Sequence, residues 1–158
     1  MTDIRDQLIF ELDSARERMT RLVAGLDPAL EVYPGWTEKQ LLAHITGWDD
    51  LVINTLNRHL LGQPIVVSIS RGIDYYNETT VNERQDLPLE HVRREYLETR
   101  ETLKRLIRSV PAEMFDDIIV MPWGPRDSLV NFIRTFSHHE LEHEEEIRQN
   151  LEKQAGQP

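Results

Sequence analysis

Cysteine is absent from the 158 residues of this sequence. Its absence excludes disulfide bonds, iron–sulfur clusters, thiolate metal ligands and a cysteine nucleophile. Long hydrophobic runs are missing as well: residues 59–70 carry no charged side chain, but this stretch is too short to span a bilayer. Residues 1–6 include acidic side chains and no apolar run, so no secretory signal peptide is predicted. We therefore expect a cytoplasmic protein without a membrane partner.

Basic residues are few relative to acidic ones. Lys and Arg number 18 and Asp and Glu number 28, so the net charge is −10 at pH 7. A chain with this net charge is repelled by the phosphate backbone of nucleic acids and by anionic membranes. We therefore predict that nucleic acid is not a partner.

Apolar residues recur at intervals of three and four positions in four long segments, which is the spacing of one face of an α-helix. The first predicted helix begins at residue 4 and ends at Gly25 and Pro28. The second covers about residues 38–61, with Thr37 and Gln40 at the positions of a capping box. The third covers about residues 88–110, and the fourth runs from residue 127 or 128 to about residue 152.

Four amphipathic helices with one long connection predict an all-α fold, a four-helix bundle of up-down topology with a long crossover between helices two and three. The crossover, residues 62–86, contains a β-branched run at 65–69 that favours an extended conformation and a candidate helical turn at 74–83. A single domain is expected over residues 1–153. Residues 154–158 are expected to be a disordered tail.

Histidines interrupt the apolar faces of two predicted helices. The inward face of the fourth helix consists of Leu129, Phe132, Phe136, His139, His143 and Ile147. Two imidazoles at i and i+4 can be directed at one point, and His44 on the inward face of the second helix adds a third nitrogen donor. Three protein ligands with an open position are typical of a catalytic metal site. Zinc, nickel and copper all bind imidazole, so the metal stays undecided.

Each of these histidines can instead be a core residue with one hydrogen-bond partner, and the residues alone leave both readings open. His138 is rotated by about 100° from His139 around the helix and shares a polar face with Arg134 and Glu142, so we expect it in solvent. Glu140 or Glu142 is a candidate to orient a ligand imidazole, and the sequence does not choose between them.

Residues 36–48, Trp-Thr-Glu-Lys-Gln-Leu-Leu-Ala-His-Ile-Thr-Gly-Trp, resemble the second helix of the DinB/YfiT-like superfamily. His139-Glu-Leu-Glu-His143 resembles the HxxxH of the last helix of that family. The resemblance extends from the first predicted helix to about Leu151. It implies a four-helix bundle with His44, His139 and His143 as ligands of a divalent metal, zinc or nickel first among them, and it implies a homodimer.

Two functions are weighed from these observations. The resemblance implies a metal-dependent thiol S-transferase or hydrolase that acts on a small electrophilic molecule, with a low-molecular-weight thiol as a candidate cosubstrate. Trp48 and Tyr75 are candidates for the wall of the substrate pocket, and Arg126 is a candidate to hold an anionic group. The alternative is a non-catalytic bundle that binds a metal or a small ligand. A cavity that opens next to the metal would favour the enzyme.

Overall fold

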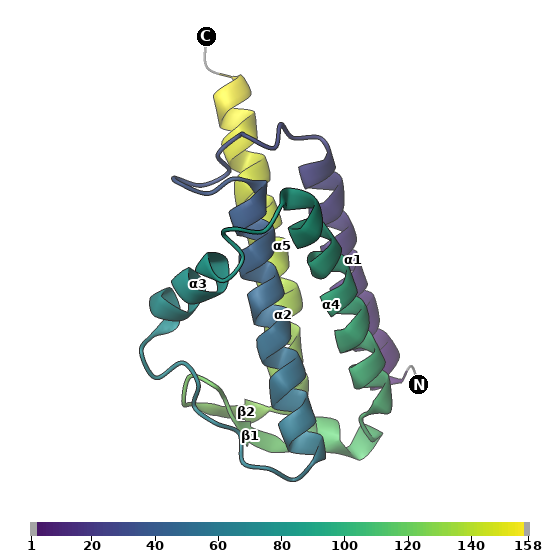
Figure 1. Ribbon diagram of the computed structural model, residues 1–158. Coiled ribbons are helices and arrows are strands. Elements are labelled where there is room, and N and C mark those ends of the chain that lie inside the picture. Colours follow the sequence, from purple (N-terminus) through teal and green to yellow (C-terminus); the bar gives the residue numbers. More distant parts are fainter. Residues whose placement is uncertain (1–2, 157–158) are drawn as a thin grey trace.

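The computed structural model describes residues 3–156 and confirms the predicted helical bundle (Figure 1). The four long helices are α1 (Ile4–Ala24), α2 (Glu38–Leu60), α4 (Leu89–Ser109) and α5 (Leu129–Ala155). The smaller elements are α3 (Ile73–Asn82), the 3₁₀-helix η1 (Ala112–Asp116) and the strands β1 (Ile118–Val120) and β2 (Arg126–Ser128). No helix within residues 3–156 combines the length and the apolar character that crossing a bilayer requires.

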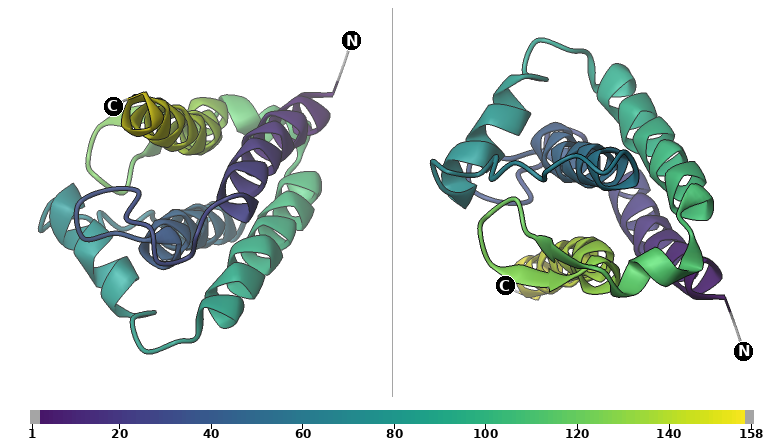
Figure 2. Two further views of the ribbon diagram at one scale, coloured as in Figure 1. Left: turned by 90° about the horizontal axis from the view of Figure 1, so that it is seen from above. Right: turned by 90° about the horizontal axis from the view of Figure 1, so that it is seen from below.

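Within the bundle, α1 packs mainly against α5, and α2 packs mainly against α4 (Figure 2). Their buried side chains form two apolar clusters. One lies toward the hairpin and includes Leu12, Leu103 and Phe132, whereas the other includes Met19 and Ile147. Between these clusters each long helix contributes one buried charged side chain: Arg16, Asp49, Arg100 and Glu140. The core is therefore two apolar layers separated by a charged one.

Local signals place the two helices that carry the predicted metal ligands. At the start of α2, the Gln40 side chain accepts hydrogen bonds from the backbone N–H of Thr37 at 3.0 Å and from its hydroxyl at 2.7 Å. At the start of α5, Ser128 Oγ accepts from the backbone N–H of Asn131 at 3.3 Å. Gly62 follows α2 with φ of 65°, a left-handed conformation that favours glycine.

The crossover between α2 and α4 contains a full helix, α3, which packs against the outside of α2 (Figure 1). The candidate turn at 74–83 is therefore a helix of 10 residues, and residues 65–69 form no strand. Contact between α2 and α3 is close at Gly47, where an added Cβ would lie 2.5 Å from Thr80 Cβ. Tyr76 also donates its hydroxyl hydrogen to the Gly47 carbonyl at 2.7 Å. Tertiary contacts of this kind hold a helix that has little apolar periodicity of its own.

A short antiparallel hairpin precedes α5. Its register pairs Ile118 with Ser128 and Val120 with Arg126. Helix α5 begins directly after β2 and continues through Ala155, two residues into the segment that was expected to be disordered. Residues 157 and 158 lie outside the described part of the chain.

Candidate metal centre

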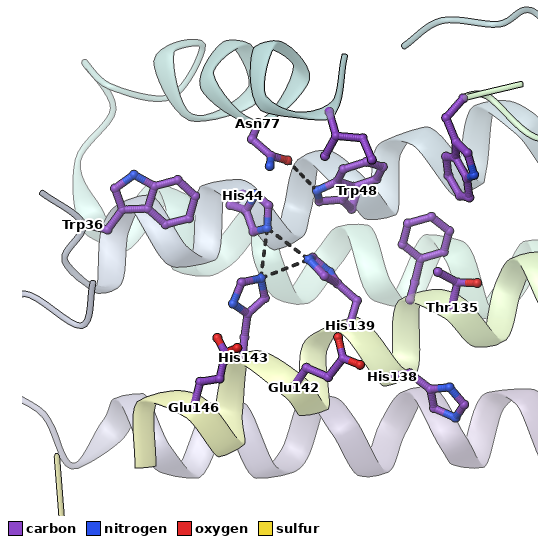
Figure 3. A pocket seen from close by; sticks show the side chains of 13 residues that line it. Trp36, His44, Trp48, Asn77, Thr135, His138, His139, Glu142, His143 and Glu146 are labelled. Atoms are coloured by element: carbon purple, nitrogen blue, oxygen red, sulfur yellow. Dashed lines mark hydrogen bonds between the residues drawn. The ribbon is translucent and has the colours of Figure 1, made fainter. Parts of the chain in front are cut away.

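Three imidazoles converge between α2 and α5 (Figure 3). The Nε2 atom of His44 lies 3.2 Å from Nε2 of His139 and 3.1 Å from Nε2 of His143. The Nε2 atoms of His139 and His143 are 3.0 Å apart. His44 is buried, and the other two side chains are half-buried. One nitrogen from each ring therefore points to a common centre.

The spacing of these nitrogens fits a divalent metal. At a metal–nitrogen distance of about 2.0–2.1 Å, two ligands of a tetrahedral ion lie about 3.3–3.4 Å apart, and two adjacent ligands of an octahedral ion lie about 2.8–3.0 Å apart. The observed separations of 3.0–3.2 Å fall between these values. The cluster could hold a metal ion without rearrangement of the backbone, and the spacing does not select one geometry.

Burial keeps the three imidazoles in the neutral form that binds metals. The pKa of His44 is lowered to about 2, mainly by loss of hydration and to a smaller extent by the neighbouring His139 and His143. The pKa of His139 is lowered to about 4, again mainly by loss of hydration and to a smaller extent by His143. The pKa of His143 is lowered by the same desolvation, against the opposing effect of Glu146. At neutral pH the rings need not release a proton before they coordinate.

His138 is exposed and lies at the edge of the cavity, with its ring directed away from the cluster (Figure 3). His59 Nε2 lies 2.9 Å from Asp117 Oδ2, and His91 Nε2 lies 3.3 Å from Glu95 Oε1. Neither ring belongs to the cluster of three. The helical spacing therefore separates the three converging histidines from the other three in the sequence.

The neighbour of His143 outside the cluster is a tyrosine that the sequence analysis did not single out. Tyr33 Oη lies 2.8 Å from His143 Nδ1 and donates to Glu146 Oε2 at 2.7 Å. Of the two carboxylates proposed to orient a ligand, Glu140 is fully buried in ion pairs with arginines, and Glu142 is exposed at the edge of the cavity. Tyr33 lies in a loop without periodicity, so no sequence pattern indicated it.

A cavity of about 550 Å³ adjoins the three histidines. Its other lining residues are Trp36, Trp48, Ile73, Asn77, Trp123, Thr135, Phe136, His138, Glu142 and Glu146. Trp48 packs against the His139 ring at a centroid distance of 5.9 Å and donates its Nε1 hydrogen to Asn77 at 3.0 Å. The walls are mainly aromatic, and Glu142 and Glu146 carry the only formal charges among the described lining residues.

Two candidates for substrate contacts lie elsewhere. Tyr75 is half-exposed on α3, with the guanidinium of Arg71 3.8 Å from its ring centroid. Arg126 is exposed on β2. Neither residue is among those that line the cavity, whereas Trp48 is. Two positions on a helix correspond to a rotation of about 200°, so Tyr75 and Asn77 lie on different faces of α3. Arg126 lies on β2, three positions after Trp123, which is in the turn of the hairpin.

Comparisons with known proteins agree with this fold. A family model described as DinB superfamily matches residues 11–147. Among solved structures, DfsB, described as a sibling lethal factor precursor, is similar with a TM-score of 0.79 at 18% identity over 98% of both chains. A protein from Streptococcus pneumoniae has a TM-score of 0.77 at 14% identity over 96% of this chain and 92% of its own. A search of curated proteins finds no significant match.

The colibactin self-resistance protein ClbS is also similar, with a TM-score of 0.76 at 13% identity over 92% of this chain and 93% of its own. That structure is a complex with double-stranded DNA. The prediction that excluded nucleic acid as a partner is therefore wrong, because a protein of this fold binds it. Net charge sums over a whole surface, whereas contacts to DNA depend on the groups at one face.

Proposed function

The chain belongs to the DinB superfamily, and on this premise we propose that it is a metal-dependent enzyme in which His44, His139 and His143 hold one divalent ion. The observation that carries this proposal is the triangle of three Nε2 atoms with sides of 3.0–3.2 Å. Zinc and nickel are the first candidates because both favour imidazole ligands. Such an ion, when bound, supplies Lewis acidity that lowers the pKa of a coordinated water or thiol.

The cavity supports an enzyme rather than a closed metal-storage site. It reaches all three histidines, so a substrate of a few hundred Å³ fits beside them. Trp48, Trp123 and Phe136 offer apolar walls for the body of the substrate. Asn77 accepts from Trp48 through its carbonyl oxygen, which leaves its NH₂ group to donate to a polar atom of the substrate.

The charges around the cavity favour one class of substrate. Glu142 and Glu146 line it, and no lysine or arginine does so within the described chain. We propose a neutral or cationic electrophile with an apolar or aromatic body, which is hydrolysed or transferred to a thiol of low negative charge. Glu142 has a carboxylate beside the histidines, so it is our candidate to accept the proton of the attacking water or thiol.

A metal titration tests the proposal. Untagged protein treated with a chelator and then titrated with zinc or nickel should bind close to one equivalent. His139→Ala should lose most of this affinity, because two imidazoles hold an ion far less tightly than three. His138→Ala is the matched control and should bind within about twofold of the wild type, because its ring points away from the cluster. No binding by the wild-type protein, or equal losses in both variants, would contradict the assignment.

Turnover is measured separately on the metal-loaded protein. Esters, epoxides and aryl halides are offered in matched neutral, cationic and anionic forms, first in water and then with thiols of different charge. Conversion of a neutral or cationic probe that is lost in His139→Ala supports the enzyme. Stoichiometric metal binding without any turnover would support the non-catalytic alternative.

A further inference from the structure

Tyr33 reaches the metal centre from the loop between α1 and α2. Its backbone pairs with that of Trp36, whose N–H donates to the Tyr33 carbonyl at 2.9 Å. The Tyr33 ring meets the His143 ring edge to face at a centroid distance of 5.6 Å. The loop thus holds the hydroxyl group between His143 Nδ1 and Glu146 Oε2.

The number of protons available decides the direction of these two hydrogen bonds. A phenol has one hydrogen to donate, and an ionised carboxylate can only accept. A tyrosine hydroxyl carries its proton at neutral pH. Its hydrogen lies toward Glu146, and the 2.8 Å contact with His143 must therefore be donated by Nδ1–H.

We infer that Tyr33 and Glu146 together hold His143 in the tautomer with its proton on Nδ1. A neutral imidazole carries one proton, so Nε2 is then left with a free lone pair directed into the histidine cluster. Tyr33 and Glu146 are positioning residues, and the consequence for metal affinity rests on the proposed function. Within residues 3–156 His44 has no such partner, because its Nδ1 is buried without a hydrogen bond.

The tautomer can be measured on metal-free protein. In ¹⁵N-labelled, chelator-treated protein, long-range ¹H–¹⁵N correlations of the imidazole ring should show His143 protonated at Nδ1. In Glu146→Ala the Tyr33 hydroxyl loses its acceptor and donates to Nδ1 instead, so the proton of His143 should move to Nε2. Glu146→Gln should keep the wild-type tautomer, because an amide oxygen still accepts from the hydroxyl.

Glu142→Ala is the matched control for this experiment. It removes the same charge from the same helix, but Tyr33 makes its hydrogen bond to Glu146 and not to Glu142. The tautomer of His143 should not change in this variant. A wild-type His143 protonated at Nε2, or the same tautomer in Glu146→Ala as in the wild type, would overturn the inference.

Metal affinity provides the second readout, measured as zinc competition with a chromophoric chelator. Tyr33→Phe and Glu146→Ala should weaken zinc binding by about 10–100-fold, the usual effect of losing a residue that orients a ligand histidine. Glu146→Gln should stay within about threefold of the wild type, because its amide oxygen still accepts from the Tyr33 hydroxyl. If the wild type bound no zinc while the tautomer changed as expected, the proposed function would fail and the role of Tyr33 would stand. If zinc bound with equal affinity to the wild type, Tyr33→Phe and Glu146→Ala, the inference would fail alone.

Discussion

Arg100 donates to Glu140 at 2.8 Å in a fully buried ion pair, and Glu140 directly follows His139 in the sequence. Arg100 also forms two hydrogen bonds to Asp49, at 2.9 and 3.0 Å. Arg16 completes the group through contacts with Asp49 at 2.7 Å and Glu140 at 3.0 Å. Two cations therefore face two carboxylates, and the layer between the apolar clusters is balanced in charge.

Removing one carboxylate from this layer should destabilise the fold strongly. In Glu140→Ala, two buried guanidinium groups would face Asp49 alone, and an uncompensated buried charge costs about 3–5 kcal/mol. We expect a loss of this size in the free energy of unfolding, measured by urea denaturation of metal-free protein. Glu142→Ala, two positions along the same helix and exposed, should change it by no more than ~0.5 kcal/mol. A loss below about 1 kcal/mol in Glu140→Ala would contradict the assigned role of the layer.

Gly47 controls how closely α3 approaches α2. A Cβ at this position would lie 2.5 Å from both Cβ and Cγ2 of Thr80, which real atoms do not tolerate. Gly47→Ala should therefore destabilise the protein by about 1–3 kcal/mol, although alanine is the better helix former. The change should also alter the fluorescence of Trp48, because α3 carries its partner Asn77.

Gly25→Ala is the control for this prediction. Gly25 ends α1 with φ of −92°, and its added Cβ would lie 3.7 Å from the nearest atom, so little effect is expected. Thr80→Gly combined with Gly47→Ala should recover part of the loss, because it removes the side chain that collides. Independent, additive effects of the two substitutions would show that the close contact does not limit the packing of α3.

Acid should weaken the metal-free fold before carboxylates are protonated. Imidazoles in the unfolded chain bind protons below a pKa of about 6.5, whereas desolvation lowers the folded pKa of His44 to about 2 and that of His139 to about 4. Between pH 6.5 and about 4, the unfolded state therefore binds more protons than the folded state. The free energy of unfolding should fall with falling pH by about 1.4 kcal/mol per unit for each such histidine.

Urea denaturation of chelator-treated protein at several pH values between 7.5 and 4.5 checks this dependence. Above pH 7 the two histidines should add no pH dependence. The slope between pH 6 and pH 5 should be smaller in His44→Gln by up to about 1.4 kcal/mol per unit, because this variant lacks one of the groups. Equal slopes in the wild type and the variant would show that His44 takes up its proton in the folded state.

Helical periodicity in the sequence was sufficient to predict the four long helices. Apolar residues that recur at three and four positions lie on one face of a helix, and such helices bury this face by packing against one another. The same periodicity put His139 and His143 on one face and His138 on another. It indicated α3 only as a candidate turn at 74–83, because the place of this helix depends on the contact between Gly47 and Thr80. Net charge was misleading for nucleic acid, because it contains no information about position.

The four long helices and the shared face of His139 and His143 were thus determined by the sequence itself, through the regular geometry of helices. His44 meets them only because α2 and α5 pack side by side. Only the tertiary structure decided which residues surround them. Tyr33 comes from an irregular loop, and its hydroxyl meets His143 across 110 positions of the chain. Likewise, nothing in the sequence distinguishes Arg16 and Arg100 from the exposed arginines of the helices. Only the packing of the helices brings them into ion pairs with Asp49 and Glu140. Contacts between distant segments depend on how complete elements pack, and no local pattern records them.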